Sequence, residues 1–120
     1  MKIPEIKSAQ VTFKEKFFFT EVKDEKLYLS NGCYIEATHD QDCCENNYAD
    51  FDSIKNTPLM GTPFDSVVFD AWEGGIRING YPVNCYSEQN GYYSTEITFL
   101  LREEYGRYLL AFEGDCEMDD

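Results

Sequence analysis

A β-hairpin near the start of the chain is predicted by the stretch Leu27-Tyr28-Leu29-Ser30-Asn31-Gly32-Cys33-Tyr34-Ile35-Glu36-Ala37-Thr38. The Asn-Gly pair at its centre tolerates the positive φ angles of a two-residue type I′ turn. Apolar residues alternate with polar ones on both sides of this turn, which indicates a hairpin with one buried face. The residues expected on that face are Leu27, Leu29, Cys33 and Ile35.

Further strands are predicted on both sides of this hairpin. Residues with strand-like alternation or a short apolar run occupy 11–19 before it and 67–72, 76–78, 81–86, 97–101 and 108–112 after it. Two more Asn-Gly pairs, at 79–80 and 90–91, mark turns. Because the connections are short, the strands should pair mostly in antiparallel fashion.

One helix is predicted between the hairpin and the later strands, from about Cys43 to Ile54. Asp42 is a suitable N-cap, and Glu45 follows it at the capping-box position. An apolar stripe with helical spacing supports this interpretation. Its members are Cys44, Tyr48, Phe51 and Ile54.

The sequence therefore predicts one α+β domain over residues 1–120. We expect a mostly antiparallel sheet of seven or eight short strands, arranged as a curled meander or a small barrel, with one helix after the second hairpin. Residues 1–8 should form a loose N-terminal arm, and residues 113–120 an acidic, frayed tail.

The charge of the chain is strongly uneven. Residues 1–26 hold six Lys and five acidic residues, whereas residues 27–120 hold four basic and 18 acidic ones, so net charges of +1 and −14 give −13 for the whole chain. Such a field repels nucleic acids and anionic membranes. It favours a protein partner with a basic surface.

The cysteines and the absence of long apolar runs predict a soluble, cytoplasmic protein. No stretch has the length of a membrane span or of a signal peptide, so reduced thiols are the expectation. Five cysteines cannot all pair within one chain. The neighbouring pair Cys43-Cys44 rarely meets the geometry of a disulfide.

Unusual residue types gather in two short motifs, His39-Asp40-Gln41-Asp42-Cys43-Cys44-Glu45 and Glu88-Gln89-Asn90-Gly91-Tyr92-Tyr93-Ser94. The two motifs resemble the signature pair of a family of small proteins from phages and from bacteria of the Bacteroides type. The likeness covers roughly residues 25–101. It implies a phage-associated domain, and it implies no catalytic residue because the family has no established activity.

Two chemical interpretations of the first motif are possible. Imidazole and thiolate ligands from His39, Cys43 and Cys44 would suit zinc, but adjacent cysteines lack the usual two-residue ligand spacing. Alternatively, Cys43 or Cys44 could act as a nucleophile with His39 as its base, since the first turn of a helix lowers the pKa of a thiol. Neither constellation is specific enough, so we predict no metal, no cofactor and no catalytic residue.

A binding surface explains both motifs with fewer assumptions. Tyrosine provides a large, rigid contact area with a polar tip. The candidate binding residues are His39, Asp40, Asp42, Cys43, Cys44, Glu45, Asn90, Tyr92, Tyr93 and Ser94.

The resulting hypothesis is a non-enzymatic interaction module. It would bind a host or phage protein through an acidic, tyrosine-rich surface, for example as an inhibitor or decoy that occupies a basic nucleic-acid-binding surface. The alternative is a small-molecule-binding domain with its pocket between the turns at 39–45 and 90–94.

Overall fold

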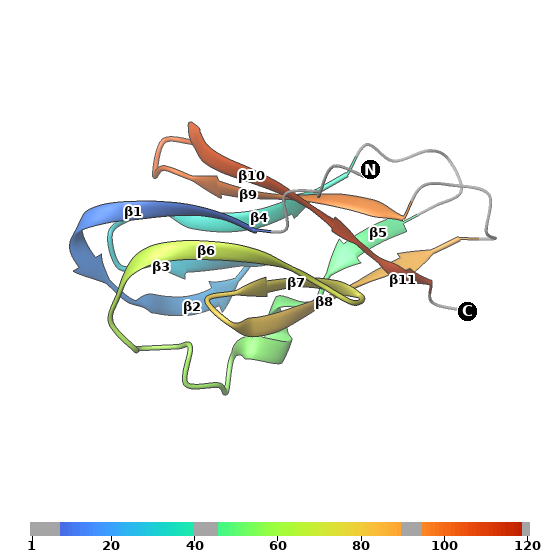
Figure 1. Cartoon of the computed structure of the whole chain (residues 1–120), viewed down its shortest axis with the longest axis horizontal. Helices are drawn as coiled ribbons and strands as arrows, with labels where there is room; N and C mark the ends of the chain where they lie inside the picture. Colours follow the sequence, from blue (N-terminus) through green and yellow to red (C-terminus); the bar gives the residue numbers. More distant parts are fainter. Residues whose placement is uncertain (1–7, 40–45, 90–94, 119–120) are drawn as a thin grey trace, which may run out of the picture.

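The computed structural model describes residues 8–39, 46–89 and 95–118, which form two β-sheets and one short 3₁₀ turn (Figure 1). One sheet has the strand order β1-β6-β7-β8-β11, with β5 also paired to β8, and the other has the order β10-β9-β4-β3-β2. The first six elements are β1 (Ser8–Phe17), β2 (Phe19–Lys23), β3 (Lys26–Leu29), β4 (Tyr34–Thr38), β5 (Asn46–Ala49) and η1 (Phe51–Ile54). The others are β6 (Phe64–Trp72), β7 (Gly75–Ile78), β8 (Tyr81–Glu88), β9 (Glu96–Arg102), β10 (Tyr108–Asp115) and β11 (Glu117–Met118).

The chain passes from one sheet to the other at Phe18. Phe17 pairs with Phe64 of β6, whereas Phe19 pairs with Leu29 of β3. Both Phe17 and Phe19 are buried, while Phe18 is 45% exposed. The single strand predicted at 11–19 is therefore two strands, and Figure 1 shows the bend that separates β1 from β2.

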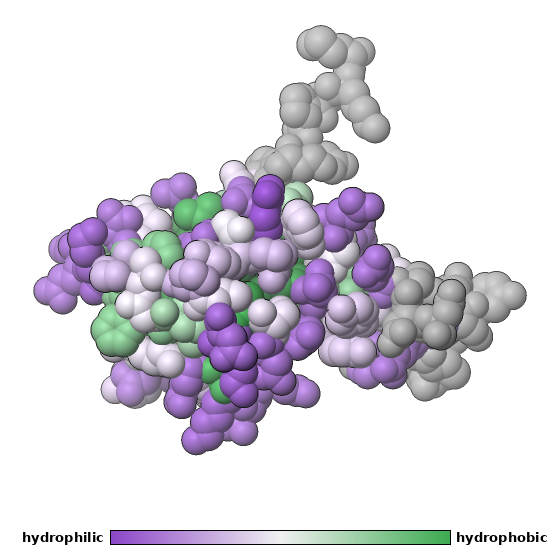
Figure 2. Space-filling view, turned by 90° about the horizontal axis from the view of Figure 1, so that it is seen from below, coloured by the Kyte–Doolittle hydropathy of each residue, from purple (hydrophilic) through white to green (hydrophobic). Residues whose placement is uncertain are grey.

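The core lies between the two sheets. The four hairpin residues predicted to share a buried face are all buried, which confirms the alternation over residues 27–35. Phe69 of β6 and Phe99 of β9 connect the two layers, with ring centroids 6.4 Å apart, and neither is exposed. On the face of the molecule in Figure 2, hydrophobic residues form small patches separated by hydrophilic ones.

The two described Asn-Gly turns differ in geometry. Asn79 and Gly80 both have positive φ, as a type I′ turn requires. At the first hairpin only Gly32 has positive φ, and the amide of Leu29 donates to the carbonyl of Cys33 at 2.9 Å, so the loop contains three residues. The side chain of Asn31 accepts a hydrogen bond from the amide of Cys33 at 3.0 Å, which stabilises this wider loop. The predicted two-residue turn is wrong here.

The predicted helix over 43–54 is also wrong. Its described part consists of strand β5 and the 3₁₀ turn η1. Tyr48, assigned to the helical stripe, lies in β5 opposite Tyr86 of β8, with ring centroids 5.7 Å apart. The capping residue is Asp50, whose carboxylate accepts from the amide of Asp52 at 3.1 Å. The predicted N-cap Asp42 lies outside the described residues.

The α+β class is therefore corrected to an all-β fold, in which the described residues form eleven strands in two sheets instead of a single meander or barrel with a helix. Pairing is mostly antiparallel, as predicted, and the parallel ladder joins β8 to β11. As far as residue 118, the tail expected to fray belongs to β10 and β11, and Cys116 between them is buried. Within the described residues, no helix is long and apolar enough to cross a membrane.

Candidate functional site

Most of the predicted binding residues lie outside the part of the chain that the structure describes. Of the ten, only His39 lies within the described ranges, directly after β4. The other nine, in 40–45 and 90–94, fall outside them. The described ends of the two motifs, His39 and Glu88, line the same cleft. Whether the candidate residues at 40–45 and 90–94 share a surface with them stays a prediction.

A polar cleft of about 460 Å³ lies beside His39. Its other lining residues come from the end of β4, from β5 and its surroundings, and from Glu25 and Glu88. The β5 side of the cleft is fixed by buried Asn47, whose Nδ2 donates to the carbonyl of Glu96 at 2.9 Å. Ser87 of β8 donates a hydrogen bond to the Asn47 side-chain oxygen. Asn47 therefore has a structural role, because its side chain connects β5 to both β8 and β9 through these hydrogen bonds.

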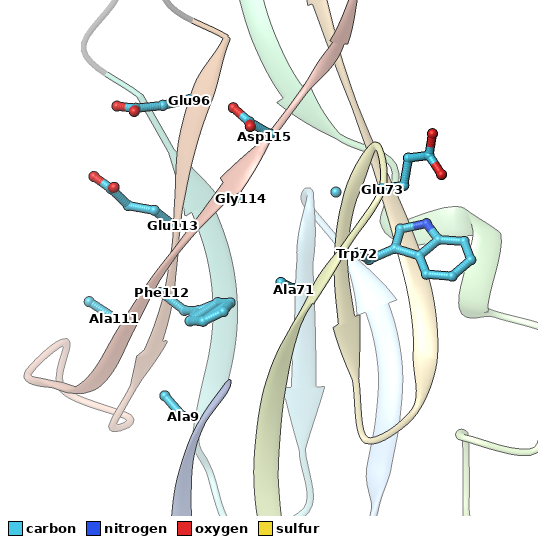
Figure 3. A pocket seen from close by; sticks show the side chains of 11 residues that line it. Ala9, Ala71, Trp72, Glu73, Glu96, Ala111, Phe112, Glu113, Gly114 and Asp115 are labelled. Carbon is cyan, nitrogen blue, oxygen red and sulfur yellow. The ribbon is translucent and has the colours of Figure 1, made fainter. Parts of the chain in front are cut away.

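A larger groove of about 1000 Å³ lies between the two sheets, where β10 diverges from β1 and from the β6–β7 hairpin (Figure 3). We call it the acidic groove. Its carboxylates are Glu73, Glu96, Glu113 and Asp115, and its other lining residues are Ala9, Ala71, Trp72, Gly75, Ala111, Phe112 and Gly114. Among the described residues that line it there is no Lys, Arg or His.

The two walls of the acidic groove differ. Figure 3 shows Phe112 pointing from β10 into the groove, with Ala71 on the opposite wall. The side chains of Trp72 and Glu73 stand on the far side of the β6–β7 hairpin, where the Trp72 ring centroid is 5.5 Å from the guanidinium carbon of Arg77. The groove therefore has an apolar interior. On the wall formed by β9 and β10, Figure 3 shows Glu96 and Glu113 pointing away from that interior, on the opposite side of the strands from Phe112.

Three carboxylates share one exposed face of that wall. Asp115 lies directly opposite Glu96 in the β9–β10 ladder, and Glu113 is two residues along β10 from Asp115, so all three point to the same side. Like charges placed opposite each other across two strands are destabilising. The hydroxyl of Thr95 donates to the carboxylate of Asp115 at 3.3 Å. The gathering of three carboxylates marks this face as a candidate for recognition of a cationic group.

Two of the described cysteines, Cys85 and Cys116, are hydrogen-bonded to each other. Cys33, Cys85 and Cys116 are buried free thiols. Burial, and to a lesser extent the charge of Glu103, raises the pKa of Cys33. A hydrogen bond with Cys116, together with burial, raises the pKa of Cys85, and the same hydrogen bond lowers the pKa of Cys116 against the effect of burial.

We expect Cys33 and Cys85 of the native protein to react slowly with iodoacetamide at pH 7. Their raised pKa values leave little thiolate at that pH, so the alkylation rate should rise as the pH increases through and beyond the ordinary thiol range. Peptide mapping by mass spectrometry measures each rate, with urea-unfolded protein as the control. Equal rates in the native and unfolded proteins would contradict the prediction.

Sequence reasoning missed the acidic groove. The excess of acidic residues after residue 26 indicated a charged surface but not its place. Glu113 and Asp115 were assigned to a frayed tail, whereas they belong to a strand paired with β9. The alternation of Tyr108, Leu110 and Phe112 was a usable signal, because extending it by three residues places Glu113 and Asp115 on the exposed face.

No family model, curated protein or solved structure matches the chain. The resemblance of the motifs at 39–45 and 88–94 to a phage and bacterial family therefore stays a prediction.

Proposed function

We propose that the protein is a non-enzymatic interaction module that binds a basic segment of another protein in the acidic groove. The observation that carries this proposal is the carboxylate face of Glu96, Glu113 and Asp115 beside an apolar interior that contains Phe112. A cationic side chain bound there would be attracted by the three carboxylates. Apolar side chains of the same segment would cover Phe112 and Ala71.

The charge of the whole chain supports a basic protein as the partner. A net charge of −13 accelerates the approach of a positively charged surface and repels nucleic acids. In the decoy form of this proposal, the bound segment belongs to a host or phage protein that otherwise holds nucleic acid. The tyrosine part of the predicted surface, Tyr92 and Tyr93, lies outside the described residues and is not needed for the groove.

Binding of a basic peptide should weaken steeply with salt. The probe is an acetylated and amidated peptide of alternating Lys and Val, Lys-Val-Lys-Val-Lys-Val-Lys. Raising NaCl from about 50 mM to about 500 mM should weaken its binding by more than about tenfold, because exposed charges are screened over a shorter distance. Isothermal titration calorimetry measures the affinity at each salt concentration.

Matched variants separate the groove from the general charge of the protein. Glu113→Gln combined with Asp115→Asn should weaken binding of the peptide at least about tenfold at low salt, since two charge-assisted contacts are lost. Glu21→Gln combined with Asp24→Asn removes the same charge from β2 and the turn that follows it, at the opposite edge of that sheet, and should change the affinity less than about twofold. Equal losses in both double variants, or no binding to the wild-type protein at low salt, would refute the proposal.

A further inference from the structure

Strand β10 presents its edge, and not one of its faces, to the acidic groove. It is the last strand of its sheet, with β9 as its neighbour on the other side. Five consecutive residues of β10, 111–115, line the groove. Because side chains alternate between the two faces of a strand, five residues in a row can border a groove only where the strand turns its edge toward it.

The hydrogen-bond pattern shows which backbone groups lie on this edge. The amide of Cys116 donates to the carbonyl of Thr95 at 2.7 Å, on the β9 side. Bonded and non-bonded pairs alternate along an antiparallel ladder, so the amides and carbonyls of Gly114 and Phe112 also face β9. Those of Ala111, Glu113 and Asp115 face away from β9. No backbone bond from these outward groups to another described residue is present.

We propose that the open edge of β10 is the docking site for an extended, basic segment of a partner protein, which adds to the sheet as one more strand beside residues 111–115. This inference rests on the proposed function and adds the way in which the segment is held. The backbone of the segment bonds to the outward groups of β10. Its Lys or Arg side chains lie on the side of Glu113 and Asp115, and its apolar side chains lie on the side of Phe112.

The charge of the edge selects this occupant over a second copy of the chain. Pairing β10 with β10 would bring Glu113 and Asp115 of the two copies close together, and like charges across strands repel. Acidic residues on an edge strand are a known protection against such self-association. The same residues attract a strand that carries Lys or Arg, so they distinguish between the two partners.

A proline substitution tests the edge without changing its charge. Ala111→Pro removes one outward amide and places a ring on the open side, where an edge strand accepts proline. We expect it to weaken binding of the Lys-Val peptide at least about tenfold while the steep salt dependence remains. Ala111→Ser keeps the amide and should bind like the wild-type protein. Glu113→Gln should instead reduce both the affinity and its salt dependence.

Modified peptides give a second test that does not depend on the folding of a variant. The amides of the Val residues and those of the Lys residues lie on opposite edges of an extended peptide, so N-methylation of either set blocks one edge. Pairing with β10 predicts that one methylated peptide loses at least about tenfold in affinity while the other retains it. Equal, salt-dependent binding of both methylated peptides and the unmodified one would overturn edge pairing and leave the proposed function standing. Dimers that protect the amides of 111, 113 and 115 from hydrogen exchange without peptide would also overturn it.

Discussion

Phe99→Ala is expected to lower the free energy of unfolding by about 3 to 5 kcal/mol, the range of a large aromatic residue deleted from a core. Phe99 is fully buried in β9, and its ring lies 6.4 Å from that of Phe69 in the other sheet and 6.0 Å from that of Phe51 in η1. Removing the ring leaves a cavity between the two layers and takes away both aromatic contacts. Urea denaturation followed by circular dichroism measures the loss.

Phe18→Ala is the matched control for that experiment. It also removes a phenyl ring, but from a position that is 45% exposed, so the free energy of unfolding should fall by no more than about 1 kcal/mol. A similar loss in both variants would mean that Phe99 is not packed between two layers. An unchanged slope of the free energy with urea concentration would show that the variant still unfolds from an equally compact state.

The strands could be predicted from the sequence because their signal is local. The alternation over residues 27–35 and over 97–101 reports which side chains face the core, and these residues are buried as expected. The arrangement of the strands in two layers has no such signal. It depends on Phe17 pairing with Phe64 while Phe19 pairs with Leu29. Three consecutive phenylalanines do not indicate that the first and the third pair with different sheets.

The helix over 43–54 shows how a local pattern misleads. The spacing of Tyr48, Phe51 and Ile54 suits one face of a helix, but it suits equally a short strand followed by a 3₁₀ turn that buries its last two apolar residues. The pairing of β5 with β8 decides between the two structures. In this pairing Tyr48 lies opposite Tyr86, which is 38 positions later in the sequence. Tertiary pairing overrides helical spacing here, since Asn46 and Asn47 are weak helix formers.

The acidic groove could not be predicted because it depends on register. Counting residues shows a surplus of carboxylates, but only the β9–β10 ladder places Asp115 opposite Glu96. The open edge likewise depends on sheet order, which ends at β10. The two motifs that dominated the sequence analysis contribute three described residues, His39, Glu88 and Gln89, and two of them, His39 and Glu88, border a different cleft.

Gly75→Ala should be the most disruptive small substitution in the described part of the chain, with an expected loss of at least about 3 kcal/mol from forced overpacking. An added Cβ would lie 2.1 Å from the carbonyl oxygen of Val83 and 3.2 Å from the Cα of Asn84. Both neighbours are backbone of β8 and cannot rotate away, so β7 and β8 would have to separate. Because Gly75 also lines the acidic groove, the variant should bind the basic peptide more weakly than its remaining folded fraction predicts.

Gly61→Ala tests whether collision, and not backbone conformation, causes that loss. Gly61 has a φ of +81°, which disfavours any side chain, yet an added Cβ would meet nothing within 4 Å. Conformational strain alone should therefore cost about 1 to 2 kcal/mol there. Urea denaturation of the two variants compares the costs. If Gly75→Ala loses no more stability than Gly61→Ala, the close approach of β7 to the Val83 carbonyl is wrong, and with it the position of the β6–β7 hairpin that forms one wall of the groove.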